Sequence, residues 1–169
     1  MKTLLAAATA VSLLAIAAPA SAGVYGSLGY SQSQYEAPDV DFDEVTGRLG
    51  WGSDTTWWGF EAEASFGVGE ETVAGVDTKL TSDLAAFAVA HFDVSEQFTL
   101  FARAGYGVTR FEFQPGLDVS VDGPAYGVGA QFNFGERDGV RFDYTYHDLT
   151  TDTDEASDKF TISWVRKFR

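Results

Sequence analysis

Residues 57–68 read Trp-Trp-Gly-Phe-Glu-Ala-Glu-Ala-Ser-Phe-Gly-Val, and this stretch decides the fold. The residues at even-numbered positions, from Trp58 to Val68, are all apolar, whereas the alternate positions hold two glutamates, a serine and glycines after Trp57. A period of two belongs to a β-strand, whose successive side chains point to opposite faces. This segment is therefore predicted to be a strand that separates an apolar environment from a polar one.

The same alternation recurs along the rest of the chain. The other segments that show it are residues 24–31, 44–51, 98–109, 126–134, 140–147 and 159–168. Residues 84–92 form a further strand that is apolar on both faces. For that strand the period leaves open whether Phe87 and Val89 or Leu84 and Phe92 point outward. Eight strands are predicted in all.

The connections between these strands differ in length and favour a membrane barrel over a soluble β-sandwich. Short connections are expected at residues 53–56, 93–97 and 135–139, and long ones at residues 33–43, 69–82, 112–123 and 149–157. Aromatic residues gather near the strand ends, as they do in the aromatic girdles of outer-membrane barrels, which also alternate short turns with longer outer loops. The predicted fold is all-β, an eight-stranded antiparallel up-and-down transmembrane β-barrel. Both termini and the short turns are expected on the periplasmic side.

Residues 1–22 differ in composition from the rest. Lys2 precedes an apolar, alanine-rich run at residues 4–18, and Ala20-Ser21-Ala22 resembles a cleavage site, so a secretory signal peptide is predicted with Gly23 as the first mature residue. The run is too short for a transmembrane anchor, which needs about 20 apolar residues. Residues 23–169 are then a single outer-membrane β-barrel domain.

The composition of the mature chain limits its partners and its stabilising interactions. Cleavage removes one of the 11 basic residues and none of the 25 acidic ones, which leaves a net charge of −15. Such a surface excludes nucleic acid as an expected partner. The chain contains no cysteine, so an exported fold without disulfides must rest on hydrogen bonds and packing.

The chain resembles the family of small eight-stranded outer-membrane proteins that includes the OmpA transmembrane domain and the OmpX-like surface proteins. The resemblance covers the mature chain and rests on the strand rhythm, residues 100–107 (Leu-Phe-Ala-Arg-Ala-Gly-Tyr-Gly) and the closing strand at 160–168. That strand is similar to the family's terminal assembly signal, which implies recognition by the barrel-insertion machinery through the strand ending at Phe168. Here Arg169 follows Phe168, whereas the family usually stops at the aromatic residue.

The inward faces of the strands carry a set of charges that is predicted to close the lumen. The network consists of Arg48, Glu61, Glu63, Arg103, Arg141 and Asp143. Its three positive and three negative charges cancel, and buried charges persist only when they are paired and hydrogen-bonded. A barrel that does not conduct is therefore expected.

The outer loops are predicted to be acidic. Their carboxylates include Asp39, Asp41, Asp43, Asp152, Asp154 and Glu155. Clustered carboxylates can hold divalent cations, although these lack the glycine and the spacing of an EF-hand loop. Solvated negative loops are the simpler interpretation, and Ca²⁺ or Mg²⁺ that bridges the loops to lipopolysaccharide phosphates is a third one.

Three functions are compatible with this pattern. The first is a non-enzymatic barrel protein that serves envelope integrity, adhesion or surface interaction; the second is a small pore. The third is a lipid A-modifying enzyme built around His147 at the outer rim, but no serine is expected at a matching position. No catalytic residue, metal or cofactor is predicted. The expected partners are outer-membrane lipid, lipopolysaccharide and an unknown extracellular ligand, and the protein is expected to be a monomer.

Overall fold

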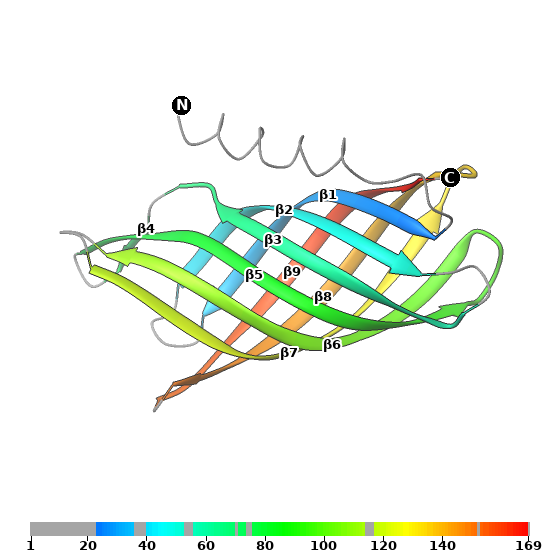
Figure 1. Ribbon diagram of the computed structural model, residues 1–169. Coiled ribbons are helices and arrows are strands. Elements are labelled where there is room, and N and C mark those ends of the chain that lie inside the picture. Colours follow the sequence, from blue (N-terminus) through cyan, green and yellow to red (C-terminus); the bar gives the residue numbers. More distant parts are fainter. Residues whose placement is uncertain are drawn as a thin grey trace.

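Antiparallel strands close into a ring, as the ribbon in Figure 1 shows. The computed structural model describes residues 23–35, 40–52, 56–69, 71–73, 76–113, 117–151 and 153–168. For residues 71–73, 76–77, 113, 117–118, 150–151 and 153–155 it describes the backbone only. The predicted signal peptide at residues 1–22 lies outside the described residues. Within these ranges we find no helix with the length and apolarity needed to cross a membrane.

Apart from β3 and β4, which both pair with β5, each strand pairs with its neighbours in the chain, and the first strand also pairs with the last. The strands are β1 (Val24–Tyr35), β2 (Val40–Gly52), β3 (Trp58–Gly67), β4 (Glu71–Val73), β5 (Val76–Asp93), β6 (Phe98–Phe113), β7 (Leu117–Asn133), β8 (Asp138–Thr151) and β9 (Thr153–Phe168). Pairing of β1 with β9 and of β3 with β5 closes the ring. A closed ring leaves no unpaired backbone edge within the hydrocarbon region of a membrane, where water cannot satisfy it.

The nine labelled strands form an eight-stranded barrel because β3 and β4 share one position in the ring. Both pair with β5, β3 up to Ser65 opposite Asp83 and β4 from Glu71 opposite Thr78. Between them Gly69 has a φ of 128°, which side-chain-bearing residues rarely adopt. The prediction of an eight-stranded antiparallel barrel is confirmed.

The two ends of the barrel differ. Val24 and Phe168 are paired with each other at one end, here called the terminal end, together with the three short connections that follow β2, β5 and β7. The opposite end is called the far end. The predicted short turns at residues 53–56, 93–97 and 135–139 agree with these strand boundaries to within one or two residues.

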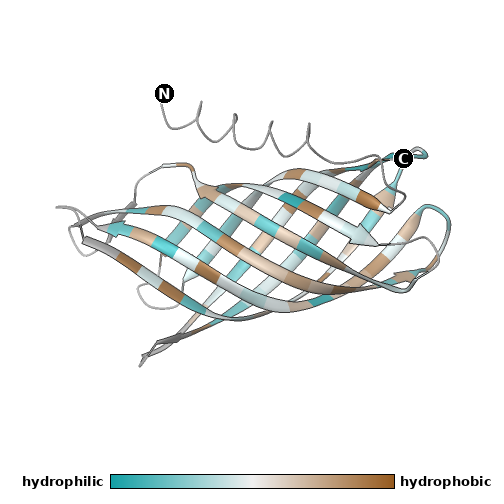
Figure 2. Ribbon diagram, in the orientation of Figure 1, coloured by the Kyte–Doolittle hydropathy of each residue, from teal (hydrophilic) through white to brown (hydrophobic). Residues whose placement is uncertain are grey.

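Apolar side chains cover the outside of the barrel over most of its height, and Figure 2 shows them alternating with polar residues along the strands. The strand that is apolar on both faces is resolved by the structure. Phe87 and Val89 point into the barrel and are 2 % exposed, whereas Leu84 and Phe92 point outward. Together with Phe101 and Ala125, the inward Phe87 and Val89 form an apolar section of the lumen.

A row of tyrosines marks the level at which this outward apolar face ends. The hydroxyls of Tyr30, Tyr106 and Tyr144 donate hydrogen bonds to the carboxylates of Asp43, Asp122 and Asp158, respectively. Each aspartate lies on the strand next to its tyrosine. It is not the residue paired with the tyrosine but the one two positions further towards the far end. Tyrosine has an apolar ring and a polar tip, so it suits the boundary between lipid and water.

Beyond the tyrosines the strands continue and their polarity reverses. Apolar residues now point inward and form a cluster that we call the apolar cap, whose buried members are Tyr35, Phe42, Leu80, Val121 and Leu149. Asp41, Asp43, Glu112, Asp122 and Asp148 are exposed on the outside of this section. We call the strand segments beyond the tyrosines the extension. Its side chains are apolar inside and polar outside, as in a soluble barrel, whereas the membrane-facing part has the opposite pattern.

The extension corrects the prediction of four long outer loops. Most of residues 33–43, 69–82, 112–123 and 149–157 is strand, and the strands of three of these hairpins are separated only by residues 36–39, 114–116 and 152. The alternation of apolar and polar residues continues beyond the tyrosines, but there the apolar residues point inward and the polar residues outward. A segment without an outward apolar face therefore resembled a loop in the sequence, although its period of two persists.

Candidate functional site

The lumen is the site at which the structure brings the sequence-predicted residues together. Arg48 on β2 lies opposite Glu63 on β3 in the strand register, and its Nε donates to that carboxylate at 2.6 Å. The two terminal nitrogens of Arg48 reach across the barrel to the two oxygens of Asp143 at 2.9 and 2.8 Å. This is the paired, two-bond geometry that makes arginine suited to carboxylates.

Arg103 on β6 occupies the centre of the network. Its Nη1 lies 2.7 Å from Glu63 and 3.5 Å from Glu61, and its Nη2 lies 3.1 Å from Asp143. The guanidinium also lies over the ring of Phe87, 4.3 Å from the ring centre. Arg103 thus connects three carboxylates and an aromatic face.

Arg141 on β8 completes the predicted set. It donates two hydrogen bonds to the carboxylate of Glu61, and its Nε lies 3.4 Å from Asp143. Its guanidinium lies 3.7 Å from the centre of the Phe101 ring. All six predicted side chains are within 1 % of complete burial, so the structure places them in one continuous network inside the barrel.

Three further charged residues belong to the lumen but are missing from the predicted set. Lys159 on β9 lies 2.8 Å from Asp83 and 3.1 Å from Glu44, and it also lies 3.1 Å from Glu63, which joins it to the arginine network. The described lumen charges are therefore four basic and five acidic, not three and three. The inward register of residues 159 and 44 was visible in the sequence, whereas Asp83 adjoins the strand whose facing the period leaves open.

Apolar side chains pack beside these charges inside the barrel. Phe87, Val89, Phe101 and Ala125 form one buried cluster, and the apolar cap forms another at the far end. Glycines make room for the large side chains: a Cβ on Gly129 would lie 2.3 Å from the Phe101 ring, and one on Gly50 would lie 2.2 Å from the Tyr25 ring. The interior is packed, as expected for eight strands, whose barrel is just wide enough for side chains to fill.

We expect the purified protein to show no steady single-channel conductance in planar lipid bilayers. The side chains of the apolar cap and of the arginine network are buried inside the barrel, so an ion that crosses would have to displace them. Channel recordings of wild-type protein, with a known porin as positive control, test this. Reproducible conductance steps that scale with the amount of protein would contradict a closed lumen.

The two histidines do not form a surface-accessible reactive site. His147 points into the lumen and is 3 % exposed, and Ser157 lies opposite it in the register and is also buried. This corrects the expectation that no serine matches the position of His147. Among the described residues, however, the Nε2 atom of His147 has no hydrogen-bond partner, and both side chains face away from the lipid. His91 lies half-buried near the terminal end.

The predicted acidic residues divide into three groups. Asp41 and Asp43 are exposed on the outside of β2, not in a loop. Asp39 and Asp152 lie outside the described residues, and Asp154 and Glu155 are described only by their backbone in β9. Among the residues whose side chains are described, no three His, Asp or Glu side chains are grouped so that they could hold a metal ion.

Comparisons with known proteins agree with this architecture. Residues 3–168 match the family model described as outer membrane protein beta-barrel domain. Ail, the attachment invasion locus protein of Yersinia pestis, has a similar structure, with a TM-score of 0.67, 18 % identity, and coverage of 86 % of this chain and 99 % of Ail. Neisserial surface protein A aligns with a TM-score of 0.69 and 14 % identity over 86 % of this chain and 96 % of that one.

A third similar structure is OprG from Pseudomonas aeruginosa, with a TM-score of 0.62 and 12 % identity over 88 % of this chain and 97 % of OprG. A comparison with curated protein sequences found no match. At these identities the similar structures show the fold, whereas the family model covers nearly the whole chain. This chain belongs to the outer membrane protein β-barrel domain family and is an integral outer-membrane protein.

Proposed function

We propose that this protein is a non-enzymatic surface protein whose rigid, closed barrel displays the extension to the outside of the cell. The observation that carries this proposal is the reversal of side-chain polarity beyond the tyrosine row. A membrane anchor alone needs only the apolar band, but here the strands continue with a separate apolar core and a polar outer wall. The extension is a rigid, water-exposed surface of the kind that binding proteins present.

The charge of the outer wall points to the class of partner. Exposed acidic side chains at residues 41, 43, 112, 122 and 148 outnumber the basic side chains described there, the exposed Arg110 and the half-buried Lys79. Ail has been crystallised with the heparin analogue sucrose octasulfate, which is strongly anionic. The acidic wall of this chain would repel such a ligand, so a basic protein or peptide surface is the partner class that we propose.

The two other functions receive less support from the geometry. A pore requires a hydrated path, whereas the lumen contains paired, buried charges and two buried apolar clusters. A lipid-modifying enzyme requires a nucleophile and a base that reach the lipid, whereas His147 and Ser157 are both buried in the lumen.

Adhesion of intact cells to charged polymers tests the proposal. Cells with the wild-type protein should adhere to immobilised polylysine more strongly than cells without it, and should not gain adhesion to immobilised heparin. A variant with a shortened extension, in which the paired residues Gln32 and Asp43 are joined by Asn-Gly, should lose part of this gain. A second variant, Asp41→Asn with Asp122→Asn and Asp148→Asn, changes only the charge and should lose it as well.

Equal adhesion to polylysine by cells with and without the protein would refute the proposal, as would a gain on heparin. Surface expression of each variant is checked by its heat-modifiable mobility in gels. The charge variant is the sharper test, because it leaves the apolar cap in place.

The proposed orientation, with the terminal end in the periplasm, predicts a specific labelling pattern. After removal of residues 1–22 the chain has three lysines. Lys79 lies in the extension, Lys159 is buried in the lumen and Lys167 lies at the terminal end. A membrane-impermeant amine reagent added to intact cells should label Lys79 and neither of the others. After disruption of the outer membrane Lys167 should react as well, and Lys159 should react only after unfolding.

Mass spectrometry of the modified peptides reads out this pattern. Labelling of Lys167 but not Lys79 in intact cells would reverse the orientation. Labelling of Lys159 in the folded protein would show instead that water reaches the centre of the lumen.

A further inference from the structure

The buried charges of the lumen do not cancel, and the excess lies in one place. The described lumen contains five carboxyl groups and four basic side chains, all of them buried. The arginine network is balanced within itself, because its three acidic side chains are paired with its three arginines. The excess negative charge therefore belongs to the remaining three residues, in which two carboxyl groups share one ammonium group. We call them the lysine cluster: Lys159, Glu44 and Asp83.

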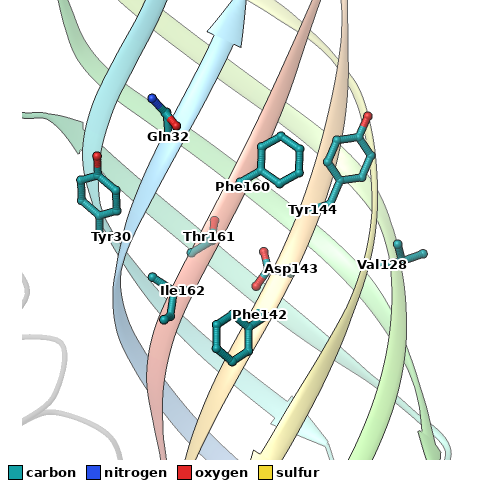
Figure 3. Close-up of a pocket in the computed structure, with 9 residues that line it drawn as sticks. All are labelled: Tyr30, Gln32, Val128, Phe142, Asp143, Tyr144, Phe160, Thr161 and Ile162. Atoms are coloured by element: carbon teal, nitrogen blue, oxygen red, sulfur yellow. The ribbon is translucent and has the colours of Figure 1, made fainter.

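The lysine cluster lies inside the barrel at the level of the tyrosine row. Figure 3 shows Phe160 on the outer wall between Tyr30 and Tyr144. Lys159 is the next residue on β9 towards the far end, and it points inward. Glu44 likewise lies on β2 one residue closer to the far end than the partner of Tyr30. The cluster is thus beyond the apolar band that faces hydrocarbon, but its side chains are enclosed by the barrel wall.

Lys159 cannot donate hydrogen bonds to all of its acidic neighbours. An ammonium group has three N–H bonds. Two are used, because Nζ donates to Ser65 Oγ at 2.6 Å and to Asp83 Oδ2 at 2.8 Å. For the third there are two acceptors, each 3.1 Å from Nζ: Glu44 Oε2 and Glu63 Oε1. Neither of these two oxygens has a hydrogen bond from the described residues.

Glu44 is the carboxyl group with the least positive charge around it. Glu63 is bound by two guanidinium groups through its other oxygen, whereas Lys159 is the one cation paired with Glu44 among the described residues. A buried charge without a partner is unfavourable, because the interior does not replace the lost water. A proton on Glu44 would remove this charge. The hydroxyl of Ser33, which contacts Glu44 Oε1, can accept the hydrogen bond of that proton.

Two other titratable groups lie within electrostatic reach of the lysine cluster, in addition to Glu63 and Arg103 of the balanced network. They are Tyr35 of the apolar cap and His147. A tyrosine can only lose a proton, which would add to the negative charge. A histidine can gain one, but Nε2 of His147 would then carry a buried N–H without an acceptor among the described residues. Glu44 is the better site for the proton.

We propose that Glu44 keeps its proton at neutral pH and that this proton balances the charge of the closed lumen. In the unfolded chain a glutamate ionises at about pH 4.3. The folded protein therefore binds one proton more than the unfolded chain above that pH. The contribution of Glu44 to stability falls as the pH rises, until Glu44 ionises in the folded state as well. The proposal does not depend on the adhesive role of the extension.

Infrared spectroscopy of the folded protein at pH 7, in a detergent without ester groups, tests the proposal directly. A carboxylic acid and a carboxylate absorb at different frequencies. The wild-type protein should show a carboxylic-acid band that shifts when glutamate is labelled with ¹³C at its side-chain carboxyl group, and does not shift with labelled aspartate. Glu44→Gln should lose the band. Glu112→Gln is the matched control, because Glu112 is exposed on the outer wall, and it should keep the band.

Asp83→Asn tests the charge balance itself. Lys159 then has Glu44 as its one partner within the cluster, so Glu44 should ionise and the band should disappear although Glu44 is still present. Absence of the band from the wild-type protein would overturn the proposal and point to a charged His147 or a bound cation. A band that shifts with labelled aspartate would overturn it as well, as would a band that persists in Asp83→Asn.

Urea unfolding at pH 5 and pH 9 provides an independent measurement. Glutamine has the shape of a protonated glutamate but cannot ionise. The unfolding equilibrium constant of the wild-type protein, divided by that of Glu44→Gln, should therefore rise about tenfold or more between pH 5 and pH 9. The same ratio for Glu112→Gln should stay within about twofold. A constant ratio for Glu44→Gln would refute the proposal. If that variant does not fold, the isotope shift in the wild-type protein still decides the question.

Discussion

Replacing Arg103 by alanine is expected to lower the free energy of unfolding by about 3–5 kcal/mol, the usual cost of removing one partner from a buried ion network. Arg103 is the residue through which Glu61, Glu63 and Asp143 share positive charge, and its loss leaves five buried carboxylates with three basic partners. It also removes the cation above the Phe87 ring. Urea unfolding in lipid or detergent, followed by tryptophan fluorescence, measures the change.

Arg110→Ala is the matched control for this substitution. Arg110 lies on the same strand, but its side chain is exposed on the extension, and its loss should change stability by no more than about 0.5 kcal/mol. Adding Glu63→Gln to Arg103→Ala should recover part of the loss, because it removes one of the unpaired charges. Equal stabilities of Arg103→Ala and Arg110→Ala would mean that the lumen charges are separately hydrated.

Replacing Ala102 by arginine is expected to destabilise the barrel by about 2–4 kcal/mol, the cost of a lipid-facing arginine near the bilayer midplane. Ala102 points outward on β6, midway between Phe98 near the terminal end and Tyr106 at the tyrosine row. Ala102→Leu should be nearly neutral because it keeps an apolar surface towards the lipid. Folding yields and urea midpoints of the two variants in the same lipid provide the comparison.

The outcome that would refute the facing assignment is equal folding of Ala102→Arg and Ala102→Leu. A similar loss in both variants would indicate instead that the position is crowded by a neighbour. The effect of arginine should also become smaller in thinner bilayers, in which the headgroups lie closer to residue 102.

Much of the barrel and its arginine network could be predicted from the sequence because the side-chain period of a strand is two. Once Glu61 and Glu63 were assigned to the inner face, the register of the neighbouring strands placed Arg48 beside them, and Arg103 and Arg141 followed from the same alternation on other strands. Which carboxylate each guanidinium contacts could not be predicted. Those contacts cross the barrel, and they depend on the stagger of the strands as well as on their faces.

The parts that sequence reasoning missed share a different cause. In the strand that contains Phe87 and Val89 both faces are apolar, so the sequence does not show which face points into the barrel. The inward position of Asp83 therefore could not be predicted. In the extension the alternation persists, but its sign reverses at Tyr30, Tyr106 and Tyr144. A search for strands with an outward apolar face therefore stops at these tyrosines. It does not predict that Tyr35 and Phe42 point into the barrel beyond them.

The reversal at the tyrosine row limits how far the barrel can move along the membrane normal. A shift of two residues towards the terminal end would carry Asp43, Asp122 and Asp158 into hydrocarbon, and a shift in the other direction would expose Tyr30 and its lipid-facing neighbours to water. When the bilayer thickness changes, the membrane around the barrel must therefore thin or thicken locally, because the protein cannot slide to a new depth. The lipid around each barrel then adopts the thickness of the barrel's apolar band, at a cost in free energy. Two barrels with bands of the same height lower this cost when they lie close together, because they share the deformed lipid. The tyrosine row would thus sort this protein into regions of matching thickness without any direct contact between proteins.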